Sequence, residues 1–221
     1  MHKSRHEVDD TRTAASDNRR QQIRDAALTL FSQFGFRGAR LEAIAEQAGV
    51  SKSNLLYHFT SKRLLYIAVL RHILDSWLSP MRNFQADQSA QVAIAQYIRV
   101  KLVLSRDRSE ASRLFCLEMM QGAPLLKEVL AGELRELVRE KSRVIETWIE
   151  NGELRPVDPH HLFYLLWGAT QHYADFAVQI EAVSGHTLEN PAFFETAVRT
   201  VQRVVLGGLT PSPTDLDDSD F

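Results

Sequence analysis

Residues 27–65 constrain the fold of this chain more than any other stretch, because two short helical patterns meet there at Gly49. Gly49 suits the positive φ with which helices often end, and Ser51 is a good N-cap for the helix that follows. The apolar positions recur at helical spacing; they are Leu41, Ile44, Ala45, Ala48, Leu55, Leu56 and Phe59. This pattern is typical of a helix-turn-helix, whose second helix lies in the major groove of DNA.

The second of these helices, expected to run from Ser51 to about Phe59, leaves a polar and basic face free. Side chains of this kind bind base edges and phosphates. We expect Lys52 and Asn54 to reach bases and the other polar residues chiefly to hold phosphates. A cation at Lys62, in the first turn of the next helix, opposes the macrodipole preference and favours a phosphate contact. The predicted DNA-binding residues are Arg40, Ser51, Lys52, Ser53, Asn54, Tyr57, His58 and Lys62.

The same segment resembles the DNA-binding domain of the TetR family of transcriptional repressors. The matching residues are Ala27, Leu30, Phe31, Gly35, Phe36, Ile44, Ala45, Ala48, Gly49, Val50, Ser51, Leu55, His58, Phe59, Ser61, Lys62 and Leu65. The family usually has tyrosine at the position of Leu56, and we expect the neighbouring Tyr57 to make its contact with the DNA backbone. The family also tends to begin the first of the two helices with Thr or Ser, which this chain lacks at 39–41, so Arg40 is expected to contact a phosphate instead.

Three later stretches, LYIAVLRHILDSWLSP, ASRLFCLEMMQGAPLL and TQHYADFAVQIEAVSG, resemble the members of that family that regulate pyrimidine utilisation. With the helix-turn-helix, the resemblance covers about residues 30–185. It implies an effector-controlled regulator that binds a near-palindromic operator in double-stranded DNA as a homodimer, formed through its last two helices. It also implies uracil or thymine as the small-molecule effector, with no cofactor.

Caps and helix-breaking residues divide the chain into helices, and no stretch shows the alternation of a β-strand. The sequence therefore predicts an all-α chain of about nine helices, with an N-terminal helix-turn-helix three-helix domain and a C-terminal helical ligand-binding and dimerisation domain. Single helices are expected over 19–34, 61–78, 124–151 and 159–184, among others. The expected segments are a disordered arm at 1–18, the DNA-binding domain at 19–65, the effector-binding and dimerisation domain at 66–209, and a disordered acidic tail at 210–221.

Charge is distributed unevenly along the chain. Residues 1–63 hold 11 Lys or Arg against 7 Asp or Glu, a net charge of +4, and the remainder holds 15 against 21, a net charge of −6. A basic end on an acidic body favours DNA binding through that end, although an excess of this size is common. The single cysteine excludes an internal disulfide, and no apolar run approaches the roughly 20 residues of a membrane span. The composition predicts a cytoplasmic protein with no membrane partner.

The expected effector site lies on the helix that begins at Pro159. This helix is apolar almost all round at its start, which indicates either contact with a second subunit or the centre of a monomer. Gln171 follows Trp167 by one turn, and its amide offers an acceptor beside donors, which suits the imide edge of a pyrimidine; alternatively, it bonds to a neighbouring helix. The predicted effector-binding residues, in which a tryptophan stacks on the base, are Trp77, Phe115, Trp167, Gln171, Tyr173 and Asp175.

Other functions are compatible with parts of the sequence. Cys116, His172 and Asp175 could supply a nucleophile, a base and an orienting acid to an enzyme, but Cys116 lies in Leu-Phe-Cys-Leu inside a helix, which is typical of a buried thiol. No residues have zinc-site spacing, and His160 and His161 diverge by about 100° on a helix. The basic helix face favours a DNA-binding regulator without a catalytic or metal site. Within that class, a different planar or apolar effector is the alternative to a pyrimidine.

Overall fold

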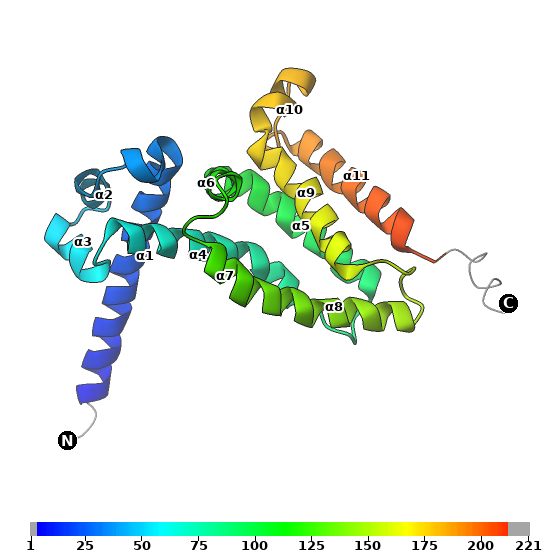
Figure 1. Cartoon of the computed structure of the whole chain (residues 1–221), viewed down its shortest axis with the longest axis horizontal. Helices are drawn as coiled ribbons and strands as arrows, with labels where there is room; N and C mark the ends of the chain where they lie inside the picture. Colours follow the sequence, from blue (N-terminus) through cyan, green and yellow to red (C-terminus); the bar gives the residue numbers. More distant parts are fainter. Residues whose placement is uncertain (1–3, 212–221) are drawn as a thin grey trace.

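The computed structural model describes residues 4–211, with side chains from residue 15, and every regular element in that range is a helix (Figure 1). The all-α prediction is confirmed. The N-terminal domain contains α1 (Ser4–Gly38), α2 (Leu41–Gln47) and α3 (Lys52–His58). The larger domain contains α4 (Lys62–Arg82), α5 (Ala90–Asp107), α6 (Ser109–Met120), α7 (Lys127–Val129), the π-helical turn η1 (Leu130–Leu134), α8 (Arg135–Glu150), α9 (Pro159–Asp175), α10 (Ala177–Ser184) and α11 (Pro191–Leu209).

The helix-turn-helix forms where the sequence predicts it. Gly49 has φ of 64° and lies just after α2, in the left-handed conformation that a side chain would strain. The hydroxyl of Ser51 accepts a hydrogen bond from the backbone N–H of Asn54 at 3.1 Å and so caps α3. Ile44 of α2 and Leu55 of α3 are fully buried in the core that α1 completes. These contacts fix the angle at which α3 presents its outer face.

The first helix is longer than expected. The sequence predicts a helix over 19–34 after a disordered arm, whereas α1 begins at Ser4 and ends at Gly38, with a break at Gly35, whose φ is 67° and ψ is 175°. The composition of the arm indicates only that little apolar surface is available for burial, and a helix can extend without burial once packed residues have nucleated it. Residues 1–3 of the expected arm lie outside the described part of the chain.

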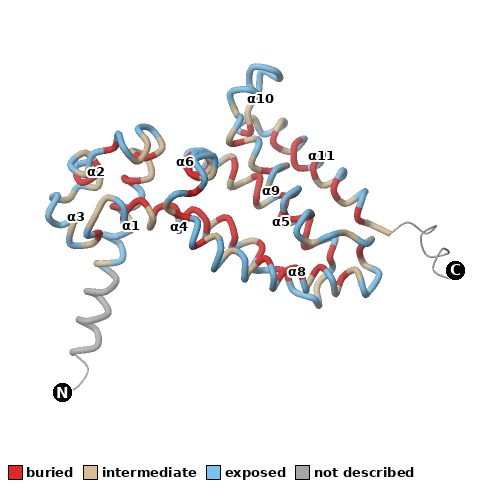
Figure 2. The backbone as a smooth tube through the Cα atoms, in the orientation of Figure 1, coloured by how far each residue is buried: buried red, intermediate tan, exposed pale blue. Residues whose placement is uncertain are grey.

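Helix α4 connects the two domains, as the sequence predicts. It starts beside α3 and continues into the larger domain (Figure 1). The hydroxyl of Ser61 caps it by accepting the Leu64 N–H at 3.2 Å. The helix continues through Pro80 to Arg82, beyond its predicted end near residue 78. Figure 2 shows a buried face along α4 that is turned toward the rest of the larger domain.

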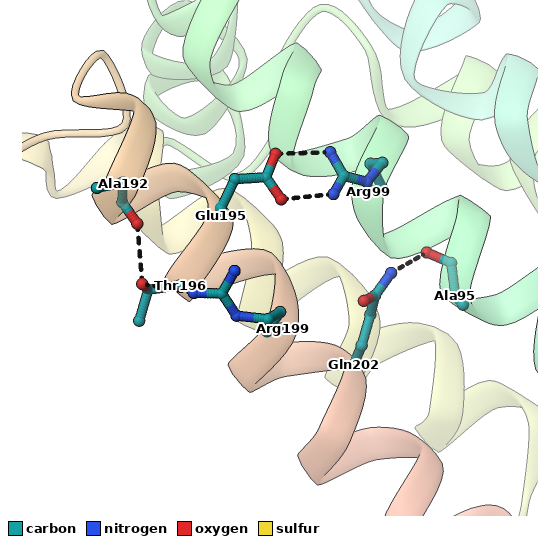
Figure 3. Close-up of polar contacts among 7 residues, drawn as sticks. All are labelled: Ala95, Arg99, Ala192, Glu195, Thr196, Arg199 and Gln202. Atoms are coloured by element: carbon teal, nitrogen blue, oxygen red, sulfur yellow. Dashed lines mark hydrogen bonds and ion pairs between the residues drawn. The ribbon is translucent and has the colours of Figure 1, made fainter.

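Helix α5 lies at the centre of the larger domain and packs against α4, α6, α9 and α11. Its contact with α11 is partly polar. The Arg99 guanidinium donates two hydrogen bonds to the Glu195 carboxylate at 2.9 and 2.6 Å, and the Gln202 side chain donates to the Ala95 carbonyl at 2.8 Å (Figure 3). These bonds fix the register of α11 on α5. Both helices therefore belong to a single packed unit with α9.

Two expected single helices are divided in the structure. The range 124–151 contains α7, η1 and α8, and the range 159–184 is broken at Phe176, whose φ of −116° and ψ of 30° separate α9 from α10. The apolar pattern continues across such local breaks, so it does not reveal them. Asp158 and Asn190, each followed by a proline, cap α9 and α11 by accepting backbone N–H bonds at 3.0 Å each. Residues 212–221 of the expected acidic tail lie outside the described range.

Candidate DNA-reading face and effector pocket

The outer face of α3 carries most of the predicted DNA-binding residues. Tyr57 is 80% exposed, and His58 is only partly exposed. The remaining predicted residues of this turn and helix are all exposed: Ser51, Lys52, Ser53 and Asn54. Arg40 precedes α2, and its side chain makes no capping hydrogen bond to that helix, as the weak cap in the sequence suggests. The face is therefore polar, accessible and held by a buried Leu55 beneath it.

Lys52 is paired in the free protein. Its Nζ lies 2.6 Å from a carboxylate oxygen of Glu42 on α2, and this hydrogen bond lowers the pKa of Glu42. Both side chains are more than half exposed, so the pair contributes little to stability. A phosphate or a base edge can compete for the same ammonium. Sequence patterns alone did not indicate Glu42 as its partner.

Lys62 has a protein partner as well. Its Nζ donates to the Arg37 carbonyl at 3.2 Å, near the end of α1, and lies 5.2 Å from the centroid of the Phe36 ring. A cation beside the carbonyl end of α1 is favourable. This contact accounts for a cation in the first turn of α4 without a phosphate, which the macrodipole of α4 alone did not indicate. Lys62 can still reach a phosphate with its remaining donors.

Arg20 of α1 adjoins α3, which the sequence pattern did not reveal. Its guanidinium donates to the His58 carbonyl at 3.4 Å and lies 4.9 Å from the centroid of the Phe59 ring. Partial burial and the charges of Arg20 and Arg19 lower the pKa of His58. These effects favour the neutral form of His58 in the free protein. A neutral imidazole offers one N–H donor to a phosphate and no charge.

The larger domain contains a cavity of about 470 Å³ between α4, α5, α6, η1 and α9. This volume is within the ~300–1,000 Å³ range of small-molecule sites. Five of the six predicted effector residues line it: Trp77, Phe115, Trp167, Gln171 and Asp175. The Trp77 and Phe115 rings are 5.9 Å apart and form part of its apolar wall. Other wall residues are Leu74, Leu78, Lys101, Cys116, Met119, Leu130, Leu134, Gly168, His172 and Phe176.

Tyr173 is the exception among the predicted residues. It lies on α9 but does not line the cavity, and its ring makes an edge contact with Phe193 of α11, with centroids 6.4 Å apart. Tyr173 directly follows His172 and comes two positions before Asp175, which both line the cavity, and each position rotates the side chain by about 100° around the helix. The cavity therefore leaves out Tyr173, because proximity in sequence is not proximity on a helix face.

Trp167 and Gln171 share one wall of the cavity, one turn apart on α9. The Trp167 indole N–H donates to the Tyr97 hydroxyl at 2.9 Å, and its ring stacks on Phe163 with centroids 6.1 Å apart. These contacts fix the ring, so Trp167 offers a ligand its surface rather than its N–H. Gln171 is partly buried. Among the described residues, no hydrogen bond ties its amide to a neighbouring helix, so it is available to a ligand.

The three residues that suggest an enzyme all line the cavity, but their contacts do not fit that chemistry. Asp175 accepts a hydrogen bond from the buried Ser112 hydroxyl. Burial and Asp175 together raise the pKa of the Cys116 thiol, which opposes formation of a nucleophilic thiolate. His172, which the i, i+3 spacing predicts to pair with Asp175, instead stacks on Phe176 with ring centroids 4.8 Å apart.

A side-chain contact joins the cavity wall to the DNA-binding domain. The Tyr66 hydroxyl at the start of α4 donates to the buried carboxylate of Glu118 on α6 at 3.3 Å. The Tyr66 ring also makes edge contacts with Phe31 and Phe36 of α1, at centroid distances of 4.9 and 5.0 Å. Phe115, one turn before Glu118, lines the cavity. A shift of α6 therefore reaches α1 and α4 directly.

Comparisons with known proteins cover nearly all of the chain. Residues 23–69 match bacterial regulatory proteins of the tetR family, and residues 70–212 match the C-terminal region of YcdC-like proteins. The chain is 54% identical over 200 residues to the HTH-type transcriptional regulator RutR of Escherichia coli strain K12, an alignment covering 90% of this chain and 94% of that protein. The chain belongs to the TetR family. It is a DNA-binding transcription regulator, as predicted in preference to an enzyme.

Solved structures share the TetR-family architecture. The ketosteroid transcriptional regulator KstR2 of Mycobacterium tuberculosis has a TM-score of 0.65 at 18% identity, covering 88% of this chain and 96% of that one. The fatty acid degradation regulator FadR of Bacillus halodurans has a TM-score of 0.64 at 20% identity, covering 86% and 95%. At these identities the likeness concerns the fold alone.

The described part of this TetR-family chain contains neither a membrane-spanning helix nor a cluster of metal-binding side chains. Between residues 4 and 211, no helix combines the length and apolar character needed to cross a bilayer. Among residues 15–211, whose side chains are described, no three His, Cys, Asp or Glu are grouped to hold a metal ion.

Proposed function

We propose that this regulator controls pyrimidine utilisation genes and that uracil or thymine releases it from its operator. The observation that carries the proposal is the position of Gln171, whose uncommitted amide faces a cavity with aromatic and apolar walls. A flat base needs such walls for its ring and paired donors and acceptors for its edge. The 54% identity to RutR, over 90% of this chain, supports the same class of effector.

We further propose that the protein binds DNA as a homodimer formed by α9 and α11. An apolar groove of about 440 Å³ lies along these two helices. Two of its large apolar side chains are exposed in the single chain, Leu165 by 56% and Val204 by 68%. A second copy placing the same helices against this groove would bury both side chains and give a two-fold interface. Such a dimer presents two α3 helices to successive major grooves of a near-palindromic site.

Release would follow from a change in the spacing of these two α3 helices. The cavity contacts α4 through Trp77 and α6 through Phe115, and the Tyr66–Glu118 bond connects both helices to the DNA-binding domain. The effector can shift the equilibrium between the two spacings only by the difference between its affinities for the DNA-binding form and for the form that cannot bind DNA. A tenfold loss of operator affinity requires about 1.4 kcal/mol of coupling, which one or two desolvated hydrogen bonds can supply.

A gel-shift titration on the promoter next to the gene tests the effector. Uracil or thymine should reduce operator binding, and calorimetry on the free protein should detect each base. A melting-temperature screen with purines, fatty acids and aromatic acids serves as the comparison. Stabilisation by one of those compounds, with no response to either pyrimidine, would favour a TetR-family regulator with another planar or apolar effector.

Asn54 is expected to read a base. Because an amide can bond to adenine with a donor and an acceptor together, Asn54→Ala should relax preference at one base pair and cost roughly 1–3 kcal/mol in operator affinity. Binding to a library of operators with single substitutions measures this directly. Gln33→Ala, at an exposed position of α1 outside the predicted DNA-binding residues, is the control. Full affinity with an unchanged base preference in Asn54→Ala would assign base reading to another residue.

Lys62 is expected to contact a phosphate in addition to the Arg37 carbonyl. Lys62→Ala should weaken binding to all sequences alike and lower the slope of log affinity against log salt by about one. Affinity measured at several salt concentrations gives the slope. Arg82→Ala, at the far end of α4, should leave it unchanged. A lower melting temperature with an unaltered slope would show that Lys62 only supports the end of α1.

A further inference from the structure

A buried lysine on α5 has no part in the predicted site, although it lines the effector cavity. Lys101 is 2% exposed, and its Nζ lies 4.1 Å from the centroid of the Trp77 ring. Among the residues described, no carbonyl or side chain accepts a hydrogen bond from this ammonium. Asp175 of α9, which also lines the cavity, acts on it only through its charge, without a hydrogen bond. A buried ammonium is costly unless acceptors replace its water.

A second buried lysine, by contrast, has acceptors for its ammonium within the protein. Lys141 of α8 donates to the Phe84 carbonyl at 3.2 Å and lies 2.9 Å from the Glu140 carboxylate. It does not line the cavity. The burial of Lys141 is therefore explained by partners within the protein. The ammonium of Lys101 lacks such partners among the described residues, which suggests that a bound ligand supplies the acceptor.

We propose that Lys101 is a specificity-determining residue of the effector site and donates a hydrogen bond to a ring carbonyl oxygen of an oxopyrimidine. The inference rests on the proposed function and names the group that reads the ligand. Lys101 of α5 lies over the Trp77 ring, and Gln171 and Asp175 of α9, which packs against α5, line the same cavity. The Asp175 carboxylate, itself held by Ser112, can accept a ring N–H.

This arrangement distinguishes between bases. Uracil and thymine have two carbonyl oxygens and two ring N–H groups, which suit an ammonium donor and a carboxylate acceptor. Cytosine keeps the C2 carbonyl but carries an amino group in place of the C4 carbonyl and has no N3–H. A site in which Lys101 bonds to the C4 oxygen and Asp175 to the N3–H would therefore set a donor against a donor in cytosine. A site built to bond to one group rejects the analogue that lacks it, because buried polar groups are then left unpaired. The cavity should therefore select oxopyrimidines over aminopyrimidines.

The pH dependence of uracil binding tests the role of Lys101 independently, because its ammonium loses a proton near neutral pH. Burial lowers the pKa of Lys101 to about 7, and the charge of Asp175 partly opposes that shift. The other titratable groups on the cavity wall are His172 of α9 and Cys116 of α6. The ammonium form donates to the carbonyl and bears the charge that strengthens the bond. Uracil affinity in the wild type should therefore fall as pH rises from 6 to 8.5.

Calorimetry with uracil, thymine and cytosine on the full chain tests this role. Lys101→Met should lower uracil affinity roughly ten- to hundredfold, the value of a hydrogen bond to a charged group, and should lose the pH dependence. Its melting temperature should be equal or higher, because an unpaired buried charge is removed. Lys101→Gln keeps a neutral donor and should bind with intermediate affinity and a flat pH profile. Lys141→Met is the control and should bind uracil as the wild type does.

The outcomes separate this inference from the proposed function. If wild type binds uracil and both Lys101 variants bind it equally well, Lys101 does not read the ligand, while the pyrimidine effector stands. Equal binding of cytosine and uracil by the wild type would likewise overturn a contact between Lys101 and the C4 carbonyl. Failure of the wild type to bind any of the three bases would overturn the effector itself and Lys101 with it.

Discussion

Replacing Gln171 with leucine is expected to abolish release by uracil while leaving operator binding intact. Leucine has a similar size and fits the apolar walls of the cavity, so the fold should persist, but it has neither a donor nor an acceptor for the imide edge. The loss of one or two buried hydrogen bonds leaves the ligand groups unpaired, which costs ~1–3 kcal/mol for each group. Calorimetry with uracil and a gel shift with and without uracil measure both properties.

A matched control separates the site from general effects of the substitution. Gln91→Leu makes the same change at an exposed position at the start of α5, outside the cavity. It should keep the uracil response. Unchanged uracil affinity in Gln171→Leu would remove Gln171 from the effector site, and the DNA-binding face would be unaffected by that result. Trp77→Ala is a less clean probe, because Trp77 also packs within α4 and under Lys101.

Replacing Leu165 with glutamate is expected to produce a folded monomer that binds the operator weakly. Leu165 is 56% exposed in the single chain, so the change should cost the monomer little. In the proposed dimer the same position is buried, and a carboxylate on each copy would be desolvated without a partner. In a dimer, binding of one α3 helix holds the second near its half-site, which raises operator affinity roughly 10²–10⁴-fold, and a monomer loses this gain.

Sedimentation gives the oligomeric state, and a filter-binding titration gives the operator affinity. Leu117→Glu places the same charge on an exposed leucine of α6 that does not line the groove along α9 and α11, and should remain dimeric. A Leu165→Glu protein that is still dimeric and binds the operator with full affinity would place the interface elsewhere. A monomer with full operator affinity would instead contradict the two-site mode of binding.

The sequence alone predicted the helix-turn-helix in detail, because its signals are local. Gly49, Ser51 and Ser61 specify a left-handed turn and two N-caps by their own chemistry, and the structure shows all three in those roles. The apolar spacing around Ile44 and Leu55 likewise fixes which face is buried. Each of these features depends on neighbours within one or two turns, so a linear pattern contains the information.

The tertiary structure decided which side chains share the cavity. Lys101, Gln171 and Asp175 come from two helices whose separation in sequence has no periodic signature, and only the packing of α5 against α9 brings them together. Tyr173 shows the opposite case, because it is adjacent to the site in sequence but turns toward α11. Caps and turns are set by bonds between near neighbours, whereas a ligand site is set by helix rotation and distance. Those depend on how the whole core packs, which no local pattern in this chain records.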